Sequence, residues 1–277
     1  MKYVAICGGL GNQMFQYAYY LMLRLKGYPV SIFIPSNKWE HIGGFELDKV
    51  FGIEHITSLW ERLYHIGFPF TRLFTLFNKQ YFGKNFKVQK EDLIPSQKFG
   101  YFYGTWQSEK YFVSPEKIRE AFRFDTSKLS PKTIELANYL KGKLTVSVHI
   151  LRGDYLSGDF SNGFGKCCDI EYYHKAIQYI SKTLENITFV FFSDDMEWVK
   201  KELPFDNAIY ADHNHGVDSW QDMYLMNICQ HNIIANSTFS WWGAWLNSNE
   251  KKIVIAPKRW WNTIENDDVV PESWIRM

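Results

Sequence analysis

The stretch KYVAICGGLGNQMFQYAYYLMLRLKGYPVSIFI, residues 2–34, contains the pattern from which the fold class follows. An apolar run predicts a strand over 2–7, and a glycine-rich segment interrupts it. Apolar side chains at helical spacing then predict a helix over 14–26, ended by Gly27 and Pro29. Residues 30–34 predict a second strand. A strand, a helix and a strand in this order form a βαβ unit.

The second half of the chain repeats this alternation. Nearly uniform apolar strands are predicted over 144–150, 187–192, 232–235 and 252–256, with a shorter one at 208–210. The helices predicted between them cover 169–184, 196–203, 218–229 and 237–246. Such strands are typical of a parallel sheet covered on both faces. We therefore expect an α/β protein with two Rossmann-like domains facing a cleft, over 1–135 and 136–277. Residues 36–100 show no clear period, and we expect mixed helix and loop there.

The composition excludes several classes of protein. The chain has 277 residues, of which 46% are hydrophobic, as in a globular protein. Lys and Arg number 31 against 30 Asp and Glu, so the basic excess of a dedicated nucleic-acid binder is absent. The four cysteines have no CxxC spacing and predict neither a disulfide framework nor a zinc site. No apolar stretch is long enough for a signal peptide or a membrane span, and we expect a cytoplasmic protein.

The glycine-rich segment 8–13 is the first candidate binding site. A dinucleotide-binding fingerprint needs glycine at its first, third and sixth places, and counting from Gly9 the sixth place is Met14. A nicotinamide dinucleotide is therefore disfavoured. A glycine loop before a helix still offers backbone N–H donors to a ligand. A tight turn alone would explain the glycines, but not the polar pair Asn12 and Gln13 beside them.

Polar side chains also follow the strand predicted over 144–150. His149, Arg152 and Asp154 stand at its carboxyl end, where open α/β sheets bind their ligands. The guanidinium of Arg152 suits a bidentate contact with a phosphate. Asp154 suits either orienting Arg152 or binding an acceptor hydroxyl. A surface Arg–Asp pair of little energetic value is the alternative.

Later strand ends carry weaker signals. Ser237 or Thr238 stands at a predicted helix N-cap, where hydroxyls and N–H groups can bind a phosphate, although an ordinary cap is the simpler explanation. The pair Asp194 and Asp195 fits a helix N-cap better than a metal site. The segment 213–215, His-Asn-His, is typical of a solvated loop, and Trp241 and Trp242 of a core.

Together these segments resemble the bacterial α-1,2-fucosyltransferases of glycosyltransferase family 11, a group that includes the animal H-antigen fucosyltransferases. The resemblance runs nearly the whole length of the chain, and it is the combination of segments that is specific. The segments are GGLGNQMFQYAYYLML at 8–23, YGTWQSEKYF at 103–112, VSVHILRGDY at 146–155, IEYYHKAI at 170–177, FFSDDMEWVK at 191–200 and HNIIANSTFSWWGAWL at 231–246.

The resemblance implies a GT-B architecture in which the domain 136–277 binds GDP-fucose and the domain 1–135 lies on the acceptor side. It implies transfer with inversion at the anomeric carbon, without a metal or another cofactor. The implied acceptor is a galactose-terminated glycan, fucosylated at its 2-hydroxyl, as in lipopolysaccharide. A lipid-linked acceptor would bring the protein to the inner membrane, although the chain has no basic amphipathic tail.

The resemblance also assigns catalytic roles to single residues. Asn12 matches an asparagine near the fucose or the acceptor, and Arg152 matches the second arginine of a His-x-Arg-Arg-Gly-Asp motif. The segment around Trp106 and Gln107 would face the acceptor. The implied catalytic residues are therefore Asn12, Arg152 and, as the candidate general base, Asp154.

The donor-binding roles implied by the resemblance fall in the second half of the chain. Two positions match those that contact the guanosine part of the donor, and a turn before a helix matches the diphosphate-binding segment. The implied donor-binding residues are His149 and Asp222 at the guanosine, Arg152, and Ser237, Thr238 and Phe239 at the diphosphate.

The chain departs from the family motif at Leu151, where the pattern has its first arginine. Leucine has neither a charge nor a donor, and losing one donor to developing charge typically costs ~10²–10³ in rate. Arg152 could take over this role, another cation (Lys110, Lys166 or Lys258) could reach in, or the site is inactivated. A non-catalytic binder of a GDP-sugar or glycan is therefore an alternative. A transferase for another GDP-sugar is a second one, because only the resemblance identifies the sugar as fucose.

Overall fold

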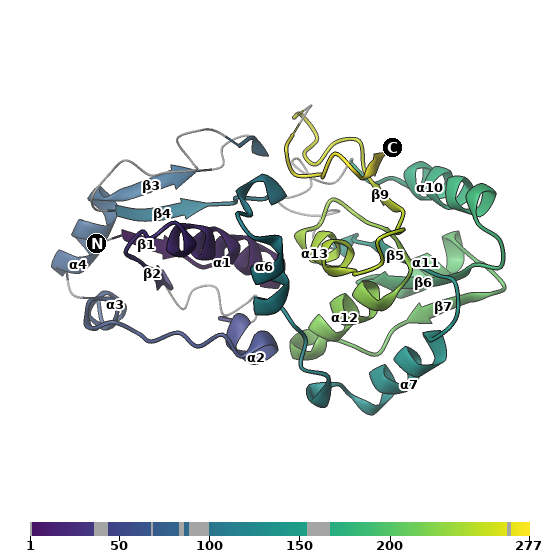
Figure 1. The fold of residues 1–277 in the computed structure, drawn as a ribbon, viewed down its shortest axis with the longest axis horizontal. Helices are drawn as coiled ribbons and strands as arrows, with labels where there is room; N and C mark the ends of the chain where they lie inside the picture. Colours follow the sequence, from purple (N-terminus) through teal and green to yellow (C-terminus); the bar gives the residue numbers. More distant parts are fainter. Residues whose placement is uncertain are drawn as a thin grey trace. The chain divides into compact units, whose positions relative to one another are not determined.

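A computed structural model describes residues 2–35, 44–67, 69–82, 86–88, 100–153, 167–264 and 267–277. The chain divides into two compact units, Met1–Asp125 and Thr126–Met277, each with its own parallel sheet (Figure 1). The boundary predicted at 135/136 falls inside helix α7 (Pro131–Leu140) instead. Because α7 buries Ala137 and Leu140 against the apolar core of the second unit, the whole helix belongs with that unit.

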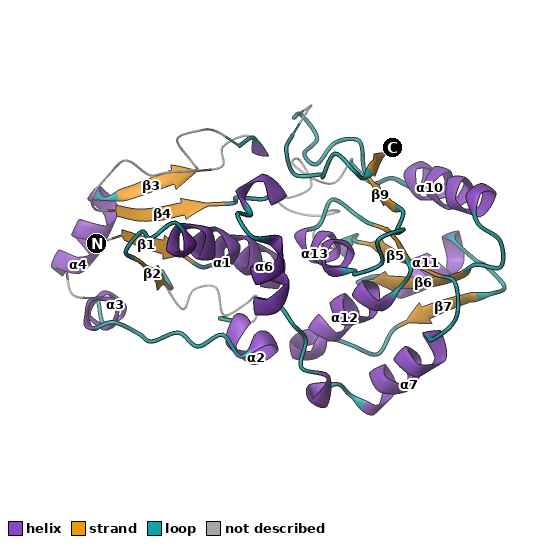
Figure 2. Ribbon diagram, in the orientation of Figure 1, coloured by secondary structure: helices purple, strands orange, loops and turns teal. Residues whose placement is uncertain are grey.

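In the described part of the first unit, four parallel strands lie in the order β2-β1-β4-β3 (Figure 2). The strands are β1 (Lys2–Ala5), β2 (Val30–Phe33), β3 (Lys79–Phe82) and β4 (Gly100–Gly104). The helices are α1 (Leu10–Leu25), α2 (Leu47–Phe51), α3 (Leu59–His65), α4 (Pro69–Phe77) and α6 (Pro115–Ala121), with a 3-10 turn at Glu109–Tyr111. The βαβ opening predicted from the sequence is confirmed.

Helix α1 begins at Leu10, four residues earlier than predicted. Its first turn contains glycine and amides, which the apolar pattern did not count as helical. Two glutamine side chains stabilise this early start. Gln13 donates to the carbonyl of Gly8 at 2.7 Å, and Gln16 accepts the N–H of Cys7 at 2.7 Å. The mixed helix and loop expected over 36–100 also contains a strand, β3, whose four residues were too few to show a period.

In the second unit, the described strands form a parallel sheet in the order β10-β9-β8-β5-β6-β7. The strands are β5 (Thr145–Ile150), β6 (Thr188–Ser193), β7 (Ala208–Ala211), β8 (His231–Ile233), β9 (Val254–Ala256) and β10 (Ile275–Arg276). The α-helices after α7 are α10 (Ile170–Thr183), α11 (Met196–Glu202), α12 (Trp220–Ile228) and α13 (Thr238–Leu246), and 3-10 turns cover Thr126–Lys128 and Gly216–Asp218. The alternation predicted over 144–256 is confirmed, with element ends shifted by a few residues.

A buried polar network joins the centre of this sheet to α12 and α13. The amide of Asn232 on β8 donates to Oγ of Ser147 at 2.7 Å and to the carbonyl of Met226 at 2.8 Å. Its oxygen accepts from Nδ2 of Asn247 at 2.9 Å, and the same Nδ2 contacts the carbonyl of Cys229 at 2.8 Å. A buried network whose members have partners defines one packing arrangement, so it holds both helices in register with β5 and β8.

None of the described helices combines the length and the apolar character that crossing a bilayer requires.

Candidate functional site

A cavity of about 280 Å³ opens in the second unit at the carboxyl ends of β5 and β6 and beside the start of α13. Strand order reverses next to β5, because β6 and β7 continue on one side of it and β8 and β9 on the other. Such a switch point is where open α/β sheets bind ligands. The cavity is lined by His149, Leu151, Phe192, Ser193, Asp194, Asn214, His215, Gly216, Ser219, Asp222, Met226, Ser237 and Phe239.

His149, the fifth residue of β5, lines this cavity and has one buried ring nitrogen. The residue is 7% exposed, and its Nδ1 has no hydrogen-bond partner among the residues that the structure describes. Burial lowers the pKa of His149 to about 4, against the opposing effect of Asp194 nearby. The ring is therefore neutral at pH 7. A buried polar atom without a partner, in a residue that lines a cavity, is one that a ligand in the cavity could satisfy after a small rotation of the ring.

Asp222 on α12 contributes a half-buried carboxyl. Its Oδ1 accepts a hydrogen bond from Nδ2 of Asn214 at 2.7 Å, and Asn214 is in turn held by the hydroxyl of Thr133 at 3.1 Å. Burial raises the pKa of Asp222 to about 7, although the bond from Asn214 lowers it. Asn214 is itself buried, so the solvated loop expected at 213–215 is wrong for this residue. The sequence pattern did not identify Asn214 as part of the site.

The N-terminus of α13 supplies backbone donors. Ser237 is its N-cap, and the hydroxyl of Ser237 makes no capping bond to the helix. The N–H groups of the first helical turn have no acceptor within an α-helix and favour an anion. Phe239 lies in this turn, with its ring 5.9 Å from that of His149. The structure thus brings Ser237 and Phe239 to the same cavity as His149 and Asp222, while Thr238 is the first residue of the helix.

Asp194 at the end of β6 holds the loop that follows β5. Its two carboxylate oxygens accept the backbone N–H groups of Arg152 at 2.9 Å and Gly153 at 2.7 Å. A Cβ at position 153 would lie 2.7 Å from Oδ2 of Asp194, so the close approach requires glycine there. Asp195 accepts the N–H of Trp198 at 3.2 Å and caps α11. The N-cap interpretation is therefore confirmed for Asp195, while Asp194 has a different role.

Arg152 does not line the cavity in this structure. Its Nε lies 3.1 Å from Oδ2 of Asp195, and its guanidinium carbon lies 3.8 Å from the centre of the Trp198 ring. Leu151, by contrast, is part of the cavity wall. The wall as described contains neither lysine nor arginine. The position at which the family motif has an arginine therefore contributes an apolar surface here.

Two residues named from the sequence have no described position. Asp154 and Lys166 both lie outside the described residues. Of the other substitute cations considered, Lys110 belongs to the first unit and Lys258 is not in the cavity wall.

Asn12 lies at the corresponding switch point of the first unit. There β1 lies between β2 and β4, so the loops after β1 and β4 leave the sheet side by side. Oδ1 of Asn12 accepts from Nε2 of Gln107 at 2.9 Å. Gly8 has φ +81°, and a Cβ on it would lie 3.2 Å from Nδ2 of Asn12. The structure thus brings together the two segments that the resemblance placed near the acceptor.

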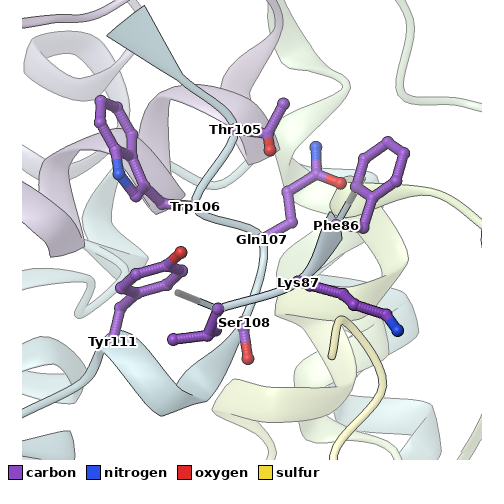
Figure 3. Close-up of a pocket in the computed structure, with 8 residues that line it drawn as sticks. Phe86, Lys87, Thr105, Trp106, Gln107, Ser108 and Tyr111 are labelled. Carbon is purple, nitrogen blue, oxygen red and sulfur yellow. The ribbon is translucent and has the colours of Figure 1, made fainter. Parts of the chain in front are cut away.

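Trp106, next to Gln107, is part of the buried core of the first unit. Its indole is fully buried and stacks on Tyr19, with ring centres 4.2 Å apart. A hollow beside it is formed by residues 105–108, Tyr111 and residues 86–88, and Figure 3 shows their side chains around it. The space between these side chains is too narrow to hold even a water molecule, so it is not a ligand pocket as it stands. The expectation that this segment faces an acceptor therefore rests on Gln107 rather than on the indole.

Glu46 is a carboxyl that the sequence pattern did not identify. It precedes α2, and it accepts a hydrogen bond from the backbone N–H of Leu10 at the start of α1. Gln13 joins the two segments, because its Oε1 accepts the N–H of Glu46 at 2.9 Å. Burial raises the pKa of Glu46 to about 7, and the bond from Leu10 and the charge of Lys49 oppose this. A carboxyl with such a pKa can accept a proton at neutral pH.

In the described part of the chain, no group of three or more His, Cys, Asp or Glu is arranged to hold a metal ion.

Comparison with known proteins gives the family. A sequence model described as glycosyl transferase family 11 matches residues 1–276. An alpha-1,2-colitosyltransferase of Escherichia coli is 36% identical over 98% of this chain and 97% of its own length. The O-antigen biosynthesis glycosyltransferase WbnK of Escherichia coli is 31% identical over 99% of this chain and all of its own length.

A solved structure supports the fold class independently. The fucosyltransferase NodZ from Bradyrhizobium superposes with a TM-score of 0.51 over 87% of this chain and 90% of that protein, at 13% identity. This likeness confirms the expected fold, an α/β protein of GT-B type with two Rossmann-like units. The sequence match over residues 1–276 and the full-length relatives show that this chain belongs to glycosyl transferase family 11.

Proposed function

We propose that this glycosyltransferase moves fucose from GDP-β-L-fucose to the 2-hydroxyl of a terminal galactoside, with inversion and without a metal. The observation that carries the proposal is the cavity of the second unit. There the unpartnered Nδ1 of His149 and the carboxyl of Asp222 lie near a helix N-terminus, within the described residues. This set fits a nucleoside diphosphate better than it fits a free sugar, because a sugar ring would leave the helix N-terminus without an anion.

The two ends of the cavity suit the two halves of GDP. The carboxylate of Asp222 can accept N1–H and the 2-amino group of guanine together, as carboxylates accept paired donors. The N–H groups at the start of α13 can bind the diphosphate. Because the described wall has no lysine or arginine, these dipoles and Ser237 would supply most of the stabilisation of the leaving GDP.

The proposed reaction is a single displacement. The acceptor 2-hydroxyl oxygen forms a bond to C1 of fucose as the bond from C1 to the β-phosphate oxygen of GDP breaks. The electron pair of that bond leaves with GDP, and a carboxylate takes the hydroxyl proton. Charge builds on the diphosphate in the transition state, so donors that are already oriented toward it lower the barrier.

Colitose is the second candidate for the transferred sugar. It is fucose without the 3-hydroxyl, and the colitosyltransferase is similar to this chain along almost its whole length. Both sugars would use the same GDP-binding cavity. A hydrogen bond to the 3-hydroxyl is the contact that would distinguish the two donors.

Incubation with each donor tests the function directly. The purified chain should convert lactose, with GDP-fucose and with EDTA present, to a product heavier by one deoxyhexose, detected by mass spectrometry and lost on treatment with an α-1,2-fucosidase. Transfer from GDP-colitose alone would assign the other sugar. Binding of GDP with neither transfer nor donor hydrolysis, across several galactosides, would favour the non-catalytic binder.

Asp222→Asn should raise the Kd for GDP about 10–100-fold, the loss expected for hydrogen bonds to a charged group. Because the carboxyl has a pKa of about 7 before binding, protons compete with guanine, and wild-type affinity should fall by up to about tenfold per pH unit below 7. The slope should vanish in the variant. Calorimetry gives the Kd of both proteins at each pH. The ratio of the two Kd values removes the effect of the nucleotide's own protonation, which is the same for both.

Asp218→Asn is the matched control, since Asp218 is exposed and outside the cavity wall. Inosine diphosphate, which lacks the 2-amino group, should lose less affinity in Asp222→Asn than GDP does. Equal GDP affinity, or an unchanged pH slope, in Asp222→Asn would contradict the placement of guanine at this carboxyl.

Leu151→Arg should raise the turnover number at least about tenfold, because it adds a guanidinium to a described wall that has none. Leu151→Met is the control, since it keeps the size and adds no charge. Initial rates at saturating donor and acceptor measure the effect. A turnover number in Leu151→Arg that equals or falls below the wild-type value would contradict this prediction. It would mean that the helix N-terminus stabilises the leaving diphosphate well enough without an arginine at position 151.

Glu46→Gln should lower kcat by about 10²–10⁴ if Glu46 takes the hydroxyl proton. The wild-type rate should fall below pH 7, where the carboxyl becomes protonated, and this limb should be missing in the variant. Asp48→Asn, an exposed carboxyl two residues away, is the control. Full activity in Glu46→Gln together with a large loss in Asp154→Asn would instead assign the base to Asp154.

A further inference from the structure

The outer side of α3 and α4 in the first unit exposes an unusual number of large apolar side chains. Phe77 is 81% exposed, Ile66 77% and Phe70 63%. We define the apolar patch as Leu59, Ile66, Phe70, Leu73, Leu76 and Phe77. The two helices pack on each other through Trp60, whose ring lies 6.1 Å from Phe70 and 5.2 Å from Phe74. The two helices that carry the patch are therefore in direct contact.

Helix α4 has its apolar stripe on the outside. Phe70, Leu73 and Phe77 follow the i, i+3, i+7 spacing of one helix face, and all three are exposed. Thr71 and Thr75, one turn apart, are buried instead, and the hydroxyl of Thr75 donates to the carbonyl of Thr71 at 2.8 Å. The orientation is the reverse of the one that places apolar side chains in a protein core. Large exposed apolar side chains gathered on one helix face in this way mark an interaction site.

Two described basic side chains, Arg62 and Lys79, lie on α3 or directly after α4. The surrounding sequence is basic as well, because between Glu61 and Glu91 it has six lysines and arginines and no Asp or Glu, although the whole chain is nearly neutral. Arg62 on α3 is exposed, and Lys79, two residues after the end of α4, lies with its Nζ 4.2 Å from the centre of the Tyr103 ring. Glu61 does not offset them at the surface. Glu61 is buried, and its carboxylate lies 2.9 Å from Nε2 of His55. The same carboxylate accepts the backbone N–H of Ile34 at 2.9 Å.

We infer that this patch docks the protein on an anionic lipid bilayer. Exposed Phe and Leu side chains with flanking Lys and Arg are the pattern by which a helix lies in a membrane interface, with apolar groups among the acyl chains and cations at the headgroups. A second copy of the chain fits the patch less well. A symmetric dimer would bring the same basic residues face to face, and like charges oppose that contact.

Vesicle flotation tests the inference without donor or acceptor, so its outcome is independent of the proposed reaction. The full chain should float with vesicles of equimolar phosphatidylcholine and phosphatidylglycerol and not with phosphatidylcholine alone. Phe70→Ser/Leu73→Ser/Phe77→Ser should weaken binding at least about tenfold. Arg62→Gln/Lys79→Gln should weaken it about fivefold for each charge removed. The second variant keeps the test valid if the first one fails to fold.

The matched control is Ile134→Ser/Tyr139→Ser/Val217→Ser, which removes three apolar side chains that are also exposed but lie in the second unit. It should bind vesicles like the wild type. Three results would overturn the inference: no wild-type binding to anionic vesicles, equal losses in the patch and control variants, or a dimer in analytical ultracentrifugation that the patch variant dissociates while vesicle binding stays the same.

Discussion

The reversal of strand order beside β5 is the constraint on which the second unit depends. Parallel strands end at one edge of a sheet, and where the order reverses, the segments that leave neighbouring strands run to opposite faces. The loop after β5 and the segment between β8 and α13 therefore separate at that edge and leave a cavity between them. The first unit repeats the arrangement beside β1, where Asn12 contacts Gln107. Both candidate sites follow from the same topology.

The chemistry of the cavity follows from which polar groups are satisfied within the protein. Asp194 is occupied by two backbone N–H groups, and Arg152 by Asp195 and Trp198. Neither side chain is free to act on a ligand without losing these contacts. Nδ1 of His149 has no such partner among the described residues. With leucine at position 151, the helix dipole and hydrogen bonds are the means by which the described wall can bind an anion.

Local sequence patterns predicted most of the second unit and less of the first. Strands β5 and β6 and helices α10 and α13 are long enough for their apolar periods to be recognised. The sequence patterns missed the start of α1, because amide side chains rather than apolar ones stabilise it. They also missed β3, because four residues are too few to show a period. Helix α4 lies within 36–100, where the sequence showed no clear period, and no local pattern indicated which of its sides faces the solvent. The structure turns its threonines inward.

The α/β class, the family resemblance and the candidate set His149, Asp222 and Ser237 could all be recognised from the amino-acid sequence. These depend on local periodicity and on motifs, which are properties of neighbouring residues. Three other features became visible only in the folded chain: Asn214 orients Asp222, Asp195 binds Arg152, and Glu46 lies against the start of α1. Each of these is a contact between segments far apart or on different elements, and burial, which raises the pKa values of Asp222 and Glu46, exists only once those segments are packed together.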